Sequence, residues 1–403
     1  MSARSPRILA FATKGVGTNE EMRLRVLLSR MGAKFLPFDR NGKGRTFLRL
    51  LSAIFHERPD LVVVEGTSWA GGLACMLARL AGRSRYVISS GDAVGPYVFA
   101  HSLLAGPLFA AYERLLCRLS DGFIGWTPYL TGRALTFGAP RAVTAAGWAP
   151  APLSDAEAAE SRQSIRQRLG IPPGAIVFGL AGALVWNPRR HYCYGLELVE
   201  AAQGCGRDDV CVLIVGDGTG LSKLRELAGQ RLGKTVFLPG GVRFQDVSTY
   251  LSAMDIASLP QSLDGVGSFR YTTKISEYAA AGLPIITGRL PLAYDLDDGS
   301  IWRLPGKTPW SATYVAALAK LMNQISLPIL TSARAKVERH RAEFDSTKQV
   351  ERITCFLSEL LEDRIERRQV TDSASSGLSP KRFPSDFTQP AEGKLSHDGS
   401  SPH

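Results

Sequence analysis

The segment that most constrains the fold is residues 255–287, DIASLPQSLDGVGSFRYTTKISEYAAAGLPIIT. Its pattern predicts a strand at 256–259 followed by a glycine-rich loop at 261–271. A helix at 272–281 and a buried strand at 283–287 complete the unit. Open α/β sheets bind their ligands in loops at the carboxyl ends of strands. The segment therefore predicts a ligand site as well as a parallel sheet.

Two charged side chains lie near the start of this predicted helix. Lys274 and Glu277 are three residues apart and so share one helix face. Thr272 or Thr273 would cap the helix, which points its first amide groups at the loop and favours an anion there. A cation for phosphate beside a carboxylate for hydroxyl groups suits a nucleotide sugar. The alternative is an ordinary βαβ unit in which Lys274 and Glu277 form a solvated ion pair.

The same segment carries a family resemblance in the residues Asp255, Leu259, Pro260, Lys274, Glu277, Tyr278, Ala281, Gly282, Leu283 and Pro284. It resembles the donor-binding segment of the family 4 glycosyltransferases, which are retaining enzymes of the two-domain GT-B fold. The resemblance implies that Lys274 lies by the donor's phosphates and that Glu277 takes the ribose hydroxyls. Many members have a sugar-binding glutamate where this chain has Phe269. We expect Asp264 or Arg270 to make that contact instead.

The loop that opens the second half gives further candidates. An apolar run at 176–181 predicts a strand that leads into Gly182. The resemblance implies that this loop approaches the donor diphosphate. The family's usual lysine–glycine pair is replaced here by Tyr194 and Gly195, so we expect Arg189 or Arg190 to bind phosphate, which a guanidinium does well. Two exposed arginines without a ligand are the alternative.

A second turn follows the apolar run at 210–215 and contains Asp217 and Gly218. It resembles the family's GDG turn, beside which the nucleotide base lies. The motifs occur in the family's order over residues 170–290. This agreement in order is stronger than any single motif.

The first half offers weaker signals. Gly15 and Gly17 follow a predicted strand at 7–13, and such a turn can bring backbone amides close to a ligand. The resemblance implies that this turn faces the cleft between the domains. Asp92 follows another predicted strand and could accept a hydrogen bond from an acceptor hydroxyl, although a turn aspartate is an equal alternative. His101, at the start of a helix predicted over 101–119, is more typical of a structural residue.

Strands alternate with helices through both halves, which predicts two doubly wound parallel sheets. An Ala/Pro-rich stretch at 149–158 is the predicted linker, and the Ser/Pro/Gly-rich end of the chain predicts disorder. Together with the resemblance, this gives a GT-B layout. We expect an acceptor-side Rossmann-like domain at 1–150, a nucleotide-sugar-binding Rossmann-like domain at 151–345, a crossover helix at 346–369 and a disordered tail at 370–403.

Charge is distributed unevenly along the chain. Residues 1–150 hold 19 Lys and Arg against 9 Asp and Glu, whereas residues 151–403 hold 29 against 28. A basic first half predicts an anionic acceptor or an anionic membrane surface, with scattered solubilising arginines as the alternative. Nucleic acid is not indicated, because no binding motif accompanies the charge.

Several classes of protein are disfavoured. No apolar run approaches the roughly 18 residues of a membrane span, and the start lacks a signal-peptide core. We therefore expect a cytoplasmic protein, either free or peripheral at the membrane. The six cysteines form no CxxC pair, so no metal site is indicated and neither a metal nor another cofactor is expected.

These patterns predict a glycosyltransferase that moves a sugar from a nucleotide diphosphate sugar to an acceptor, as in polysaccharide biosynthesis, with retention implied by the resemblance alone. The predicted catalytic residues are Lys274, Arg190 and Asp92. A nucleotide-sugar epimerase of the same fold and a catalytically degenerate binding subunit are the alternatives. The sugar and the base stay open, and the acceptor could be a glycan, a lipid carrier or a small molecule.

Overall fold

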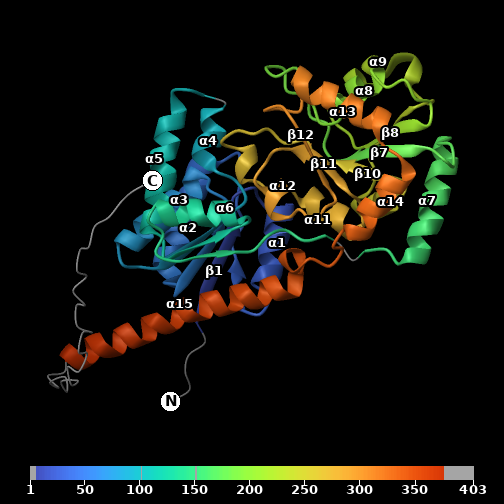
Figure 1. The fold of residues 1–403 in the computed structure, drawn as a ribbon. Coiled ribbons are helices and arrows are strands. Elements are labelled where there is room, and N and C mark those ends of the chain that lie inside the picture. Colours follow the sequence, from blue (N-terminus) through green and yellow to red (C-terminus); the bar gives the residue numbers. More distant parts are fainter. Residues whose placement is uncertain (1–5, 101, 150–151, 376–403) are drawn as a thin grey trace, which may run out of the picture. The chain divides into compact units, whose positions relative to one another are not determined.

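A computed structural model describes residues 6–100, 102–149 and 152–375, with side chains described up to residue 362. It contains two six-stranded sheets (Figure 1). We call residues 6–149 lobe 1 and residues 152–345 lobe 2. The strands of lobe 1, in spatial order, are β2 (Lys34–Phe35), β1 (Ile8–Ala12), β3 (Leu61–Glu65), β4 (Arg85–Ser90), β5 (Gly122–Gly125) and β6 (Ala142–Thr144). Those of lobe 2 are β12 (Ile301–Leu304), β11 (Ile285–Gly288), β10 (Ile256–Ser258), β7 (Ile176–Ala181), β8 (Val210–Val215) and β9 (Val236–Gly240).

Every strand pair within the two sheets is parallel, which confirms the predicted fold class. The apolar strands explain this arrangement, because a parallel sheet is covered on both faces. In β7, Phe178 and Leu180 join the core on one face, while Val177 and Ala181 join the core on the other. The carboxyl ends of the strands are thereby left to carry loops.

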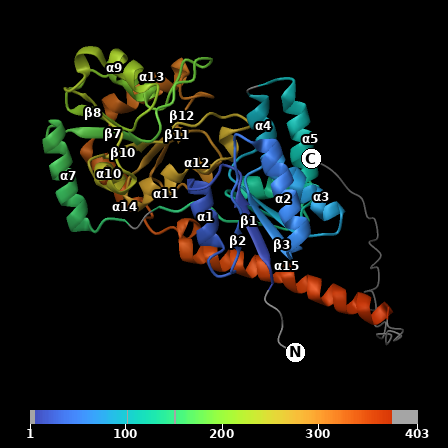
Figure 2. The same ribbon diagram turned by 180° about the vertical axis from the view of Figure 1, so that it is seen from behind.

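The helices of lobe 1 are α1 (Asn19–Leu27), α2 (Lys43–Glu57), α3 (Trp69–Leu80), α4 (Val94–Phe99), α5 (Ala105–Leu119) and α6 (Pro128–Thr136). Helix α3 contacts both α2 and α5, and α5 in turn contacts α4 and α6 (Figure 2). The Tyr112 hydroxyl on α5 donates to Ser68 O at the start of α3 (3.2 Å). Helices α2 to α6 are therefore linked by helix–helix contacts, whereas α1 packs on β1 and β3.

The helices of lobe 2 are α7 (Asp155–Leu169), α8 (Leu196–Gln203), α9 (Leu221–Ala228), α10 (Val247–Ser252), α11 (Thr273–Ala280), α12 (Leu292–Asp295), α13 (Ala312–Gln324) and α14 (Leu327–Lys336). Short 3-10 turns, all in lobe 2, are η1 (Gly229–Arg231), η2 (Phe244–Asp246), η3 (Gly267–Phe269) and η4 (Ala342–Phe344). Helix α7 begins with a capping box, in which Ser154 and Glu157 satisfy each other's backbone amides.

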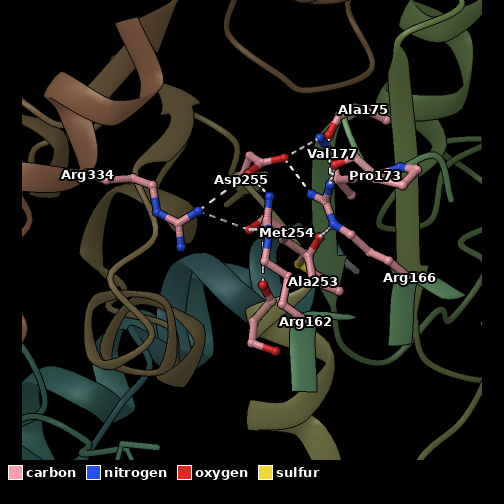
Figure 3. A network of polar contacts seen from close by, with 10 residues as sticks. Arg162, Arg166, Pro173, Ala175, Val177, Ala253, Met254, Asp255 and Arg334 are labelled. Carbon is pink, nitrogen blue, oxygen red and sulfur yellow. Dashed lines mark hydrogen bonds and ion pairs between the residues drawn. The ribbon is translucent and has the colours of Figure 1, made fainter. Parts of the chain in front are cut away.

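The buried carboxylate of Asp255 links helix α7 to the amino end of β10 through hydrogen bonds. Asp255 accepts hydrogen bonds from Arg162 Nη2 (2.6 Å) and Arg166 Nη2 (2.7 Å), and from the Val177 amide (2.8 Å) (Figure 3). Arg334 Nη1 of α14 lies 3.4 Å from the same carboxylate. One carboxylate therefore ties two helices and two strands together.

The last helix that the structure describes is α15 (Ser346–Ser375), and its first turns contact lobe 1. Arg352 Nη1 donates to Thr144 O (3.0 Å). The helix continues past residue 369, where we expected the tail to begin, because no Gly or Pro interrupts the chain before Gly377. The rest of the expected tail, from residue 376, lies outside the described residues. Within the described residues, no helix is long and apolar enough to cross a membrane.

One expected helix differs from the prediction. The stretch predicted as a single helix over 101–119 starts only at α5, and α4 precedes it as a separate short helix. The change of direction brings Phe99 against Gly106, where an added Cβ would lie 2.3 Å from the phenyl ring. His101, between the two helices, lies outside the described residues.

Candidate active site

Three adjoining cavities lie where the strand ends of the two lobes face each other. We call them the central cavity (about 760 Å³), the loop cavity (about 290 Å³) and the lobe 1 cavity (about 610 Å³). Ala183 lines both the central and the loop cavities, and Thr273 lines both the central and the lobe 1 cavities. Ligand atoms in one cavity would therefore be close to atoms in the next.

Lys274 and Glu277 both line the central cavity, together with Gly182 and Asp217. Both side chains project from α11, whose first residue is Thr273. A Cβ atom at Gly182 would lie 2.5 Å from Lys274 Nζ, so a glycine is required for the lysine to lie across this loop. The structure thus brings together residues predicted from two separate motifs.

Neither charged group on α11, the Lys274 ammonium or the Glu277 carboxylate, has an ion-pair or hydrogen-bond partner among the described residues. Both side chains are half-buried. Burial lowers the pKa of Lys274, an effect that attraction to Glu277 only partly offsets. Burial likewise raises the pKa of Glu277 against the attraction of Lys274. A bound anion would stabilise the ammonium that burial disfavours.

The turn after β8 supports the central cavity. The Asp217 backbone carbonyl accepts from the Leu184 amide (2.9 Å), and its side chain accepts from the Gly218 amide (2.7 Å). A Cβ at Gly218 would lie 2.6 Å from the Leu184 backbone, so this glycine allows two loops to touch. Gly218 itself is not among the residues that line the described cavities.

The loop cavity contains Arg190 but not Arg189. The Arg190 guanidinium lies over Trp310, 5.3 Å from the ring centroid. Tyr194 lines the same cavity, and its ring centroid lies 5.6 Å from Lys274 Nζ. The residue that replaces the family's usual lysine therefore lies beside the lysine that remains.

The residues around the substituted glutamate position connect the lobes. Phe269 O accepts from Thr127 Oγ1 of lobe 1 (2.8 Å), and the Phe269 ring packs against the lobe 1 core. Arg270 Nε donates to Asp92 Oδ1 (2.6 Å), so the two predicted site residues form an ion pair between the lobes. Position 269 thus holds an interlobe contact where the family has a sugar-binding carboxylate.

Asp264 points into its own loop. Its carboxylate accepts hydrogen bonds from the Val266 and Gly267 amides (both 2.8 Å) and from Ser262 Oγ (2.6 Å). Although burial opposes the change, these bonds lower its pKa. Asp264 lines none of the described cavities, so of the two expected replacements for the glutamate only Arg270 does.

The glycine turn after β1 shapes the site without lining it. Gly15 and Gly17 have φ of 105° and 76°, which only glycine adopts readily. Their turn places Lys14 and Glu20 at the wall of the lobe 1 cavity, where the two form an ion pair. The glycines themselves are not among the lining residues of the described cavities.

A buried cluster was missed by sequence reasoning. Arg23 of α1 pairs with Glu65 at the end of β3 (2.9 Å), and Trp126 Nε1 donates to the same carboxylate (3.1 Å). The Arg23 guanidinium lies 4.3 Å from the Trp126 ring centroid, and its Nε has no hydrogen-bond partner. No local sequence motif predicts this cluster, because its members come from three distant segments of the chain.

One polar side chain at the cavity wall lacks a hydrogen-bond partner. Thr272 Oγ1 is buried without a hydrogen-bond partner and lines the lobe 1 cavity. The described residues contain no cluster of three His, Cys, Asp or Glu side chains placed to hold a metal ion.

Comparison with known proteins agrees with this geometry. Residues 7–146 match the model of the glycosyl transferase 4-like domain, and residues 175–324 match that of the glycosyl transferases group 1. No curated protein matches the chain in sequence. The two similar lobes have the GT-B fold, and the two family models identify the chain as a glycosyltransferase that uses a nucleotide-sugar donor. The chain therefore belongs to the group 1, or family 4-type, glycosyltransferases.

Solved structures share the fold at low sequence identity. HepE from Anabaena, in complex with UDP and glucose, is 17% identical with a TM-score of 0.63, over 88% of this chain and 100% of HepE. An α,α-trehalose 6-phosphate synthase from Burkholderia multivorans is 11% identical with a TM-score of 0.62, over 94% of this chain and 100% of the synthase. A Listeria monocytogenes protein assigned as a UDP-N-acetylglucosamine 2-epimerase is 14% identical with a TM-score of 0.55, over 89% and 98%.

Proposed function

We propose that the donor is a UDP-sugar whose diphosphate binds between Lys274 and the loop at Gly182. The observation that carries this proposal is the position of the Lys274 ammonium. It has no hydrogen bond or ion pair among the described residues, and it lies against Gly182, whose missing Cβ leaves room for the lysine to cross that loop. HepE, which shares the fold, was crystallised with UDP. Glu277, one turn along α11, would accept hydrogen bonds from the ribose hydroxyls.

The chemistry follows from this placement. As the bond between the anomeric carbon and the diphosphate breaks, negative charge develops on the leaving diphosphate. Lys274 and Arg190 would stabilise that charge, and such electrostatic stabilisation is usually the largest contribution to catalysis. In this proposal the two side chains carry the phosphate charge without a metal or other cofactor. Retention at the anomeric carbon is part of the proposal through the family alone.

Asp92 is the proposed contact to the acceptor. It lines the lobe 1 cavity and also pairs with Arg270, so its carboxylate is held between the lobes. One oxygen, Oδ1, accepts from Arg270 and the second can accept from the acceptor hydroxyl. The hydroxyl oxygen would then form the new bond to the anomeric carbon as the bond to the diphosphate breaks, and the hydroxyl proton would pass to the leaving diphosphate.

Calorimetric titration with UDP tests the donor proposal. We expect wild-type protein to bind UDP and the Lys274→Ala variant to bind at least tenfold more weakly. Lys223→Ala is the matched control, because Lys223 is an exposed lysine of the same lobe outside the cavities. Equal UDP affinity in Lys274→Ala and wild type would refute the proposal. UDP binding without transfer or donor interconversion would favour the binding-subunit alternative, and interconversion would favour the epimerase.

We also propose that the enzyme acts in polysaccharide biosynthesis at the cytoplasmic face of an anionic membrane. Helix α5 supports this, because Leu108 and Leu115 are 69% and 48% exposed along one stripe, and Leu104 just before the helix is 95% exposed. Arg114 and Arg118 lie at the end of the stripe, within a strongly basic half of the chain. Apolar side chains beside cations fit the interface of an anionic bilayer.

Vesicle co-sedimentation tests the membrane proposal. We expect binding to phosphatidylglycerol vesicles but not to phosphatidylcholine vesicles. The double variant Leu108→Glu/Leu115→Glu should lose this binding, whereas Ile329→Glu, an equally exposed apolar position in lobe 2, should keep it. Self-association through the stripe is the competing outcome, and sedimentation velocity would reveal it as a dimer that the double variant cannot form.

A further inference from the structure

The lobe 1 cavity has more positive than negative charge. Three carboxylates line it, and each is matched by a cation: Glu20 by Lys14, Glu65 by Arg23 and Asp92 by Arg270. Two further cations, Arg40 and Lys43, line the same cavity. The pairing therefore leaves a surplus of two positive charges.

Arg40 and Lys43 are exposed, and no ion pair or hydrogen bond engages their side-chain nitrogens among the described residues. The neighbouring Asp39 forms no ion pair with either cation within the described chain, and its carboxylate accepts from the Asn41 amide (2.9 Å). Two unpaired cations at one cavity wall suit a phosphate or diphosphate, which a guanidinium can grip with two parallel hydrogen bonds.

The rest of the cavity wall suits a saccharide and an apolar chain. Trp69 offers an aromatic surface, while Ser90 and Asp92 offer hydrogen-bonding groups. Val98 of α4 and Phe109 of α5 line the cavity on its apolar side. Phe109 follows Leu108 of the exposed apolar stripe of α5. Helix α5 therefore presents one apolar side chain to the cavity and the preceding one to the outside of the lobe.

We propose that the acceptor is a lipid-linked saccharide phosphate or diphosphate, whose phosphate is bound by Arg40 and Lys43. Its saccharide occupies the lobe 1 cavity near Asp92, and its lipid leaves along α4 and α5. This inference rests on the proposed glycosyl transfer and specifies its acceptor. It is also consistent with the proposed membrane contact, because a lipid-linked acceptor would lie at the membrane surface that α5 contacts.

Calorimetry on the full chain saturated with UDP tests the acceptor site, since UDP prevents the probes from occupying the central cavity. The probes are farnesyl diphosphate, farnesol and inorganic diphosphate. We expect farnesyl diphosphate to bind at least tenfold more tightly than either of the others. The double variant Arg40→Ala/Lys43→Ala should weaken that binding at least tenfold while leaving UDP affinity unchanged. Arg45→Ala is the matched control, because it removes a cation of α2 that does not line the cavity.

Each result bears on the acceptor proposal separately from the donor proposal. Unchanged farnesyl diphosphate binding in the double variant would overturn it, as would an equal loss in Arg45→Ala. Equal affinity for inorganic and farnesyl diphosphate would assign the cations to a soluble phosphate and overturn the lipid-linked acceptor. If UDP itself fails to bind, the donor proposal fails, and the probes titrated without UDP still compare wild type with the double variant.

Discussion

Two carboxylates of lobe 2 lie in opposite surroundings. Asp255 is 3% exposed and faces the guanidinium groups of Arg162, Arg166 and Arg334 as well as a backbone amide. Glu277 is half-buried, and no described residue donates a hydrogen bond to its carboxylate. The first group is satisfied within the fold, whereas the second retains its full capacity to accept hydrogen bonds.

Structural and functional charges in this chain differ in whether the fold supplies their partners. Burial lowers the pKa of both Arg166 and Arg334, and Asp255 acts in the opposite direction on each. The Asp255 carboxylate therefore needs no further ligand. Lys274 and Glu277 attract each other without contact, and burial shifts both pKa values toward the neutral forms. A ligand that restores both charges would bind where the fold leaves them unsatisfied.

The largest effect is expected from removing the satisfied carboxylate. Asp255→Ala would leave three arginines around a buried site without a counter-charge, which typically costs about 3–5 kcal/mol. We expect a loss of that size in the free energy of unfolding, measured by urea denaturation. Asp155→Ala is the control, since Asp155 pairs with Arg339 at an exposed position and should change stability little. A loss below about 1 kcal/mol for Asp255→Ala would show that the cluster does not hold the lobe together.

Removing the unsatisfied cation should act on turnover and leave stability intact. Lys274→Ala is expected to lower kcat/KM by roughly 10²–10³-fold, as for the loss of one charge-stabilising donor, with no loss of unfolding free energy. The control is Lys274→Arg, which keeps the charge. Steady-state kinetics with the donor that binds will measure both variants.

The same site predicts a pH dependence of donor binding. Burial lowers the pKa of Lys274, and the diphosphate needs the charged form. Donor affinity should therefore fall as the pH rises through that lowered pKa, below the ordinary value of about 10.4. In Lys274→Arg the fall should disappear, because arginine stays charged throughout. An identical alkaline fall in both proteins would assign the titration to another group.

A third carboxylate of lobe 2, Glu197, is buried like Asp255 but lacks a cation partner among the described residues. It is fully buried and accepts from Tyr192 Oη (2.8 Å), Ser258 Oγ (3.0 Å) and the Gly195 amide (3.0 Å) instead. Burial raises its pKa to about 7. The native state therefore keeps a proton that the unfolded state releases, so stability should fall as pH rises from about 4.5 to 7.

Over that interval the Glu197 contribution amounts to about 3 kcal/mol, at 1.36 kcal/mol for each unit of pKa. Urea denaturation at pH 5 and pH 7.5 will measure it as the difference between wild type and Glu197→Gln. We expect the variant, which stays neutral, to show the flatter profile. Parallel profiles would mean that Glu197 is already charged in the native state at pH 5, so that burial does not raise its pKa.

Sequence alone predicted the fold because the strands are continuous apolar runs and the strand–helix alternation leaves little choice of sheet. It also selected Lys274 and Glu277, since their spacing on one helix is local information. Their roles stay predictions, although the structure brings them to one cavity. The Asp255 cluster was not foreseen, because Arg162, Arg166 and Arg334 are far from Asp255 in the chain.

The positions of the other candidate site residues depend on loop conformation, which the sequence does not predict. The Asp264 carboxylate accepts hydrogen bonds from the amides of its own loop. Arg189 lies outside the described cavities and Arg190 lines one, and no pattern in the sequence distinguishes the two arginines. Arg40 and Lys43 belong to no motif. Their position at the lobe 1 cavity follows from where α2 begins, which depends on tertiary packing.

The smallest effect is expected from neutralising the unsatisfied carboxylate. Glu277→Gln keeps the shape and one accepting oxygen but loses the charge, so the ribose hydrogen bonds weaken from charged to neutral ones. A difference of about 1–1.5 kcal/mol, or roughly tenfold in UDP affinity, follows from the usual strengths of such bonds. Uracil ribosides without a diphosphate should show the same tenfold loss, since the ribose contact does not require phosphate. If instead Glu277→Gln weakens UDP but not uridine, the carboxylate acts through Lys274 rather than on the ribose.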